Sequence, residues 1–239
     1  MSGRPHVLVL SGWSDGPLVP LCATFPHVKF VKVTIPTPPS GCRWLCNPFL
    51  LVLLGIIGGT PAALRFVSNF GLSSATQVGA QFSLLLFILL ALRATIARVV
   101  RYAINDGIDK TMKAISQFHP VAIVGFSWGG GVLWEMLTNK LTNKIVKLVP
   151  CLLLAPTVSA MSYASWTGIS TCTFEETGRV AIVCGDADPF CPLSQKTIMV
   201  QCKGLTYYGV NDDHVLLEAN TRALTAKILR EYLSQAHTS

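Results

Sequence analysis

Charged side chains are scarce in this chain, and they are unevenly placed. Charged residues make up 13% of the 239 positions and hydrophobic residues 51%, whereas about a quarter of the residues of a typical soluble domain are charged. No acidic residue occurs from position 16 to position 105. The net charge of +7 therefore comes largely from the basic residues of that span, which are Lys29, Lys32, Arg43, Arg65, Arg93, Arg98 and Arg101.

Several common functional signatures are also missing. The sequence contains no P-loop, dinucleotide-binding fingerprint or internal repeat, and its aromatic and basic residues do not interleave as in nucleic-acid-binding proteins. The eight cysteines form no zinc pattern, because Cys42 and Cys46 lack a matching second pair. We therefore expect no cofactor, no metal, no nucleic-acid partner and reduced thiols. The first apolar run, 7–10, is also shorter than the about 7–15 residues of a signal peptide, so no signal peptide is expected.

The most informative positive feature is a serine between two glycines. Gly125, Ser127 and Gly129 form a G-x-S-x-G pattern that follows the apolar run 121–124 and precedes the helix-like segment 130–137. A strand that turns sharply into a helix strains the residue at the turn, and any larger side chain two positions before or after it would collide. The pattern predicts that Ser127 is an exposed nucleophile at the N-terminus of a helix.

An acid and a base are predicted further along the chain. The strand-like segment 180–184 leads into a loop with Asp186 and Asp188, and the segment 205–208 leads into a loop with His214. Loops at the carboxyl ends of strands are suitable places for an acid and for the histidine that it orients. His214 is preferred because the other histidines begin a strand, precede a strand or lie in a polar tail, namely His6, His27, His119 and His237.

This order of serine, aspartate and histidine resembles that of the α/β-hydrolase superfamily. The resemblance covers residues 7–36 and 93–233. It implies an α/β fold with a mostly parallel sheet and helices on both faces, without the usual first two strands of the superfamily. We expect residues 1–36 and 93–239 to form an α/β-hydrolase domain, interrupted at 37–92 by an apolar helical insertion. The expected strands are 6–10, 28–35, 121–126, 146–154, 180–184 and 204–208, and the expected helices lie near 16–25, 93–117, 129–141, 193–202 and 215–234.

The resemblance also assigns roles to individual residues. The superfamily places its acid three residues after a glycine, with a proline following, which matches Gly185, Asp188 and Pro192. Asp186 is the alternative acid, although it suits a residue that caps its own turn. The predicted catalytic residues are therefore Ser127, Asp188 and His214.

Two backbone N–H groups are expected to form an oxyanion hole. One belongs to Trp128, which follows the nucleophile, and the other to Trp13 in the loop after the first strand. The superfamily commonly has His-Gly at the start of this loop, whereas this chain has Ser11 and Gly12. That departure removes a histidine but keeps the backbone donor.

The insertion contains two uncharged runs, 44–64 and 66–92. Each is near the about 20 apolar residues that a helix needs to cross a bilayer. The runs could form a spanning hairpin, a shallow membrane-dipping insertion, an apolar lid over a lipid-binding cleft, or buried core helices. In a hairpin, the flanking basic residues Arg43, Arg93, Arg98 and Arg101 would place the catalytic domain on the cytoplasmic side.

Together these features predict a membrane-associated serine hydrolase. Its substrate would be a small-molecule carboxylic ester or thioester, with an acyl or lipid character that is inferred by analogy from the apolar insertion. The alternative is a membrane-anchored, hydrolase-like binding or scaffold protein in which the three residues are present but unused. The sequence favours neither ester nor thioester, and it predicts no oligomeric state.

Overall fold

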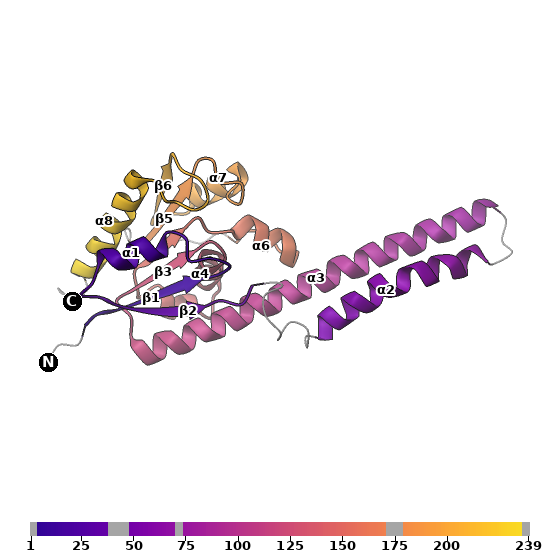
Figure 1. Ribbon diagram of the computed structural model, residues 1–239, viewed down its shortest axis with the longest axis horizontal. Helices are drawn as coiled ribbons and strands as arrows, with labels where there is room; N and C mark the ends of the chain where they lie inside the picture. Colours follow the sequence, from indigo (N-terminus) through magenta and orange to yellow (C-terminus); the bar gives the residue numbers. More distant parts are fainter. Residues whose placement is uncertain (1–3, 38–47, 70–73, 171–178, 236–239) are drawn as a thin grey trace. The chain divides into compact units, whose positions relative to one another are not determined.

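The computed structural model describes residues 4–37, 48–69, 74–170 and 179–235 (Figure 1). The predicted segment around Cys42, Arg43 and Cys46 and the tail with His237 lie outside these residues. The chain divides into two compact units. The first comprises Met1–Thr37, Ala103–Tyr163 and Thr167–Ser239, and the second comprises Pro38–Tyr102 and Ala164–Trp166.

The first unit is built on a six-stranded sheet in which every neighbouring pair of strands is parallel. The strand order is β2-β1-β3-β4-β5-β6. The central strands β3, β4 and β5 are buried along their whole length, as expected for a parallel sheet covered on both faces. The predicted α/β class and mostly parallel sheet are thus confirmed. The strands are β1 His6–Ser11, β2 Lys29–Thr34, β3 Ala122–Phe126, β4 Cys151–Leu154, β5 Val180–Gly185 and β6 Leu205–Val210.

Helices cover both faces of this sheet. Val7 and Val9 of β1 belong to a buried cluster that also contains Leu21 of α1 and Leu229 of α8. Because side chains alternate along a strand, Leu10 faces the other way, where α4 packs so closely that a Cβ on Gly129 would touch Leu10. The helices of this unit outside α3 are α1 Leu18–Thr24, α4 Trp128–Thr138, α5 Asn143–Val146, α6 Val158–Ser165, α7 Leu193–Gln201 and α8 Ala219–Gln235, of which α6 ends in the second unit.

The strand order creates one switch point at the carboxyl ends of the strands. From β1 the chain proceeds to β2 on one side, and it then returns to β3 on the other side of β1 (Figure 1). The loops after β1 and β3 therefore diverge, and in open parallel sheets a crevice at such a point is the usual place for a ligand. The loop with Trp13 and the turn with Ser127 both begin there.

One predicted strand was wrong in its first half. Residues 146–154 were expected to be extended, but Asn143–Val146 form α5 and β4 begins only at Cys151. A buried helical turn and a buried strand are both apolar, so a short apolar run does not distinguish them. Pro150, which has no N–H to donate, immediately precedes the strand.

The second unit contains α2, Pro48–Ser68, and most of the apolar part of α3, Ser74–Phe118. The predicted helix 93–117 and the apolar run before it form one helix of 45 residues, because no glycine or proline interrupts positions 80–106. Within the described residues, the segment Val78–Phe118 is long and apolar enough to cross a membrane, whereas Leu54–Ala63 of α2 is a shorter apolar helix. Many large apolar side chains of α3 are exposed, among them Val78, Phe82, Leu85, Leu86, Phe87, Leu89 and Leu90.

Two of the basic residues that flank the apolar runs, Arg93 and Arg101, make hydrogen bonds within this unit. Arg93 Nη1 donates a hydrogen bond to the carbonyl oxygen of Ala164 at 3.0 Å, and Arg101 Nε donates one to that of Ser165 at 2.9 Å. The Arg93 guanidinium also lies 5.6 Å from the centre of the Trp166 ring. These arginines therefore attach the segment 164–166 to α3.

Candidate active site

Ser127 occupies the turn between β3 and α4 in a strained conformation. Its φ of 52° and ψ of −117° lie where non-glycine residues are rare, and such strain costs about 1–3 kcal/mol. Three backbone hydrogen bonds hold it: Ser127 N donates to Leu154 O at 2.9 Å, and Ser127 O accepts from Gly131 N at 2.9 Å and Thr157 N at 3.2 Å. The surrounding structure therefore fixes the position of this residue. Ser127 is only 6% exposed, so the prediction of an exposed residue was wrong.

The two glycines of the pattern lie where no side chain fits. A Cβ on Gly129 would come within 2.2 Å of the carbonyl oxygen of Leu10. A Cβ on Gly125 would come within 2.9 Å of the carbonyl oxygen of Gly129. Both obstacles are backbone atoms, which cannot move aside as a flexible side chain could. The turn that presents Ser127 thus depends on glycine at both positions.

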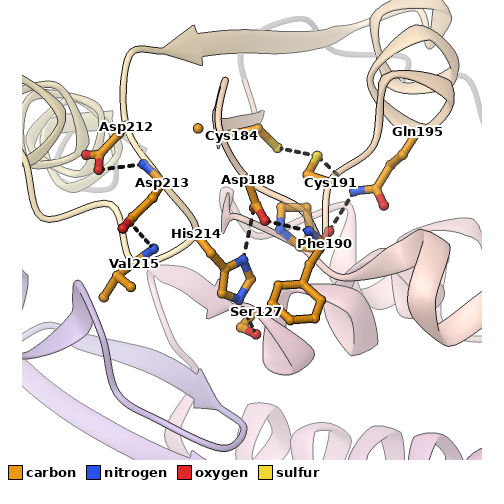
Figure 2. A network of polar contacts seen from close by, with 12 residues as sticks. Ser127, Cys184, Asp188, Phe190, Cys191, Gln195, Asp212, Asp213, His214 and Val215 are labelled. Atoms are coloured by element: carbon orange, nitrogen blue, oxygen red, sulfur yellow. Dashed lines mark hydrogen bonds and ion pairs between the residues drawn. The ribbon is translucent and has the colours of Figure 1, made fainter.

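His214 lies between Ser127 and Asp188 (Figure 2). Its Nε2 is 2.8 Å from Ser127 Oγ, and its Nδ1 is 2.9 Å from Asp188 Oδ2. Because a carboxylate only accepts hydrogen bonds, Nδ1 carries the imidazole proton and Nε2 is left to accept from the serine hydroxyl. The structure thus joins the three residues in one hydrogen-bonded chain, although they lie after three different strands.

The structure also distinguishes the two candidate acids. The side chain of Asp188 is fully buried, and its Oδ1 accepts a hydrogen bond from the backbone N–H of Phe190 at 2.8 Å. Asp186 instead has a side chain that is 67% exposed, with its carboxylate 3.8 Å from Lys196 Nζ. Asp188, and not Asp186, therefore contacts His214 and is held in place to do so.

The loops that carry Asp188 and His214 pack backbone against backbone. Asp186 N donates to Val210 O at 2.7 Å, and Ala187 N donates to Asp212 O at 3.1 Å. A Cβ on Gly185 would lie 2.4 Å from the Asp212 carbonyl oxygen, so this approach requires glycine. These contacts fix the separation between the acid and the imidazole.

A buried polar network around Gln195 contacts the loop that carries Asp188, called here the acid loop (Figure 2). Gln195, which is fully buried, donates from Nε2 to Pro156 O at 2.6 Å and to Cys191 Sγ at 3.2 Å, and its Oε1 accepts from Ser159 N at 2.7 Å. The Cys191 thiol lies 3.0 Å from Cys184 Sγ. The hydrogen bond with Cys191 and burial raise the pKa of the Cys184 thiol, so this thiol stays in its protonated, unreactive form.

Both residues predicted to supply oxyanion donors lie beside the Ser127 turn. A Cβ on Gly12 would come within 2.6 Å of Trp128 Cβ, so the loop after β1 touches the residue after Ser127. The rings of Trp13 and Trp128 have centroids 5.9 Å apart. Trp128 is the first residue of α4, where backbone N–H groups have no acceptor within the helix.

Some residues of the site were missed from the sequence. Phe190 contacts His214, and its position two residues after Asp188 was the available signal. Gln195 gave no signal, because a buried glutamine in a helix of mixed polarity looks like a surface residue. His6 takes no part in the site, since its Nδ1 lies 3.1 Å from Phe118 O.

Comparison with protein-family models, with curated proteins and with solved structures finds no match for the chain. Among the described residues, no group of three or more histidine, cysteine, aspartate or glutamate side chains is placed to bind a metal ion. What the residues do present is a strained serine, an imidazole and a buried carboxylate in hydrogen-bonded order.

Proposed function

We propose that the protein is a serine hydrolase that cleaves a carboxylic ester or thioester. The observation that carries this proposal is the hydrogen-bonded chain from Ser127 Oγ through His214 to the buried carboxylate of Asp188. A neutral imidazole with this partner on Nδ1 can take the serine proton on Nε2 as the oxygen attacks a carbonyl carbon. Strain at Ser127 also supports a functional role, because such strain is concentrated at active sites.

The proposed reaction has two stages. In the first, Ser127 adds to the carbonyl, the backbone N–H groups of Trp13 and Trp128 stabilise the oxyanion, and protonated His214 gives its proton to the departing alcohol or thiol. In the second, His214 takes a proton from water, which attacks the acyl-serine and releases the acid. Asp188 keeps the imidazole oriented and stabilises its charged form in both stages.

We also propose that the first unit has an α/β-hydrolase-type fold. Three features support this fold: the all-parallel sheet, the strained serine after the central strand β3, and the positions of the acid after β5 and of the histidine after β6. The switch point between β1 and β3 further supports a site at the carboxyl ends of the strands. In this proposal the second unit is an insertion after β2.

The substrate is proposed to be an acyl or lipid ester that is met at a membrane. The apolar segment of α3 and its exposed side chains support membrane association. The excess of basic residues around the apolar runs supports a cytoplasmic location for the first unit. The type of reaction is inferred from the site alone.

The proposed activity is tested by labelling the full-length protein in membranes with a fluorophosphonate probe. Such probes form a covalent bond with an activated serine, so the label should map to Ser127 by mass spectrometry of the digested protein. Heat-denatured protein is the control, because an unassembled serine is a weak nucleophile. Absence of labelling would favour the alternative function, a membrane-anchored binding or scaffold protein in which the three residues are unused.

Membrane association is expected to survive both a high-salt wash and an alkaline wash. Salt screens attraction between basic residues and lipid headgroups, but it does not weaken the burial of apolar surface. Membranes from expressing cells would be washed and sedimented, and the protein would be measured in the pellet. Release by salt would contradict the proposal and reduce the interaction to a peripheral one.

A matched pair of variants assigns this association to α3. Phe87→Asp/Leu90→Asp places two charges on the apolar part of α3, where each costs about 2.5–3.5 kcal/mol at the centre of a bilayer, and should move the protein out of the washed pellet. Val200→Asp/Leu217→Asp places the same charges at exposed apolar positions of the first unit. This control should sediment like the unaltered protein.

A further inference from the structure

Two phenylalanine rings flank the imidazole of His214. The ring of Phe126 has its centroid 5.5 Å from that of His214, and the ring of Phe190 has its centroid 4.8 Å away. Phe126 is 1% exposed and belongs to the core, whereas Phe190 is 46% exposed. Figure 2 shows the Phe190 ring beside the imidazole. Phe190 is therefore the neighbour of His214 that a bound molecule can touch.

The position of Phe190 corresponds to the leaving-group side of the substrate. In the proposed reaction, the departing oxygen or sulfur takes its proton from His214 Nε2, so it must come within about 3 Å of that atom. The group attached to that oxygen or sulfur then emerges next to whatever flanks the imidazole. The acyl group, by contrast, stays attached to Ser127 after this step.

Carboxylates on the loop that carries His214, which is a different loop from that of Phe190, disfavour a negatively charged leaving group. Asp212 and Asp213 immediately precede His214, and their carboxylates accept hydrogen bonds from backbone N–H groups of Asp213, Val215 and Glu218. Neutral N–H partners leave the negative charge of these carboxylates in place. An anionic leaving group would therefore be repelled as it approached His214.

We propose that Phe190 forms the wall of the leaving-group side, and that the enzyme prefers esters or thioesters whose alcohol or thiol is apolar and uncharged. This inference rests on the proposed function of the site. In this proposal, the backbone and the side chain of Phe190 have separate roles. Its backbone N–H holds Asp188, and its ring contacts the departing group.

The inference is tested with two acetate esters and the full-length protein in detergent micelles. Benzyl acetate and methyl acetate share the same acyl group and release alcohols of similar basicity, so they differ mainly in the apolar surface of the leaving group. Phe190→Ala keeps the backbone N–H and removes the ring. It should lower kcat/KM for benzyl acetate by about tenfold, the loss expected for one aromatic contact, and leave kcat/KM for methyl acetate within about twofold.

Three further measurements make the comparison specific. Leu193→Ala removes another exposed apolar side chain near the acid loop. It should not change kcat/KM for either ester. The acetate ester of 4-(hydroxymethyl)benzoic acid carries a negative charge on the leaving group, and the unaltered protein should hydrolyse it more slowly than benzyl acetate. Phe190→Leu, which keeps an apolar side chain, should retain part of the preference for benzyl acetate.

The contrary outcomes are distinct from one another. An equal loss on both acetates would show that the ring orients His214 and does not contact the leaving group. No preference of the unaltered protein for benzyl over methyl acetate would also overturn the inference. In both cases, fluorophosphonate labelling of Ser127 would still support the proposed function, whereas loss of that labelling in the unaltered protein would remove the function itself.

Discussion

Ser127→Ala is expected to lower the rate of ester hydrolysis by at least about 10⁴-fold. In the proposed reaction, the variant loses the atom that would form the acyl intermediate, and neither His214 nor Asp188 can replace it. Alanine adopts the same backbone conformation at φ 52° with no larger clash, so the free energy of unfolding should change by less than about 1 kcal/mol. Rates of hydrolysis and thermal unfolding would be measured on the same preparation.

Ser159→Ala is the matched control for this variant. Its hydroxyl is buried in the same unit and has no hydrogen-bond partner among the described residues. Its removal should leave both hydrolysis and labelling by the fluorophosphonate probe unchanged. Unaltered hydrolysis by the Ser127→Ala protein would contradict the assignment of the nucleophile.

Asp188→Asn is expected to lower kcat/KM by about 10³–10⁴-fold, close to the effect known for such an acid. An amide that accepts from Phe190 N through its oxygen presents its NH₂ group to His214 Nδ1. The imidazole must then carry its proton on Nε2, where it can no longer accept from Ser127. The fold should remain, because asparagine has the same shape as aspartate.

Asp186→Asn is the matched control, because it makes the same chemical change two residues away. The carboxylate of Asp186 is exposed and lies 3.8 Å from Lys196 Nζ, so kcat/KM should change by less than about threefold. The pH dependence of kcat/KM would be recorded for both variants. The opposite ranking would transfer the role to Asp186, and equal mild effects would argue against a histidine oriented by either acid.

The elements around the site were predictable because each has a strong local signal. The strands are short apolar runs that end in polar or glycine-rich loops, and the turn at Ser127 needs two glycines for steric reasons that apply in any such turn. The chain order of serine, acid and histidine placed all three at the same edge of a parallel sheet. The sequence left Asp186 and Asp188 as alternatives, which only the burial and orientation of the side chains separate.

The features that the sequence did not predict depend mostly on contacts between distant parts of the chain. Gln195 is buried because the loop after β4 folds over α7, and no local sequence pattern predicts that contact. The approach of the Asp212 carbonyl to Gly185 joins segments that are separate in the sequence. The length of α3 was missed because the apolar run and the amphipathic run were treated as separate elements, although nothing in the sequence breaks the helix between them.

The sheet order gives the three residues of the site unequal local stability. Ser127 follows β3, which is paired on both sides and buried, whereas His214 follows β6, which lies at one end of the strand order and is only partly buried. Peripheral elements open more readily than central ones. Fraying of β6 would withdraw the imidazole while β3 and the serine turn stay folded. Separation of His214 from Ser127 is therefore expected to need only local opening at β6, with no unfolding of the core.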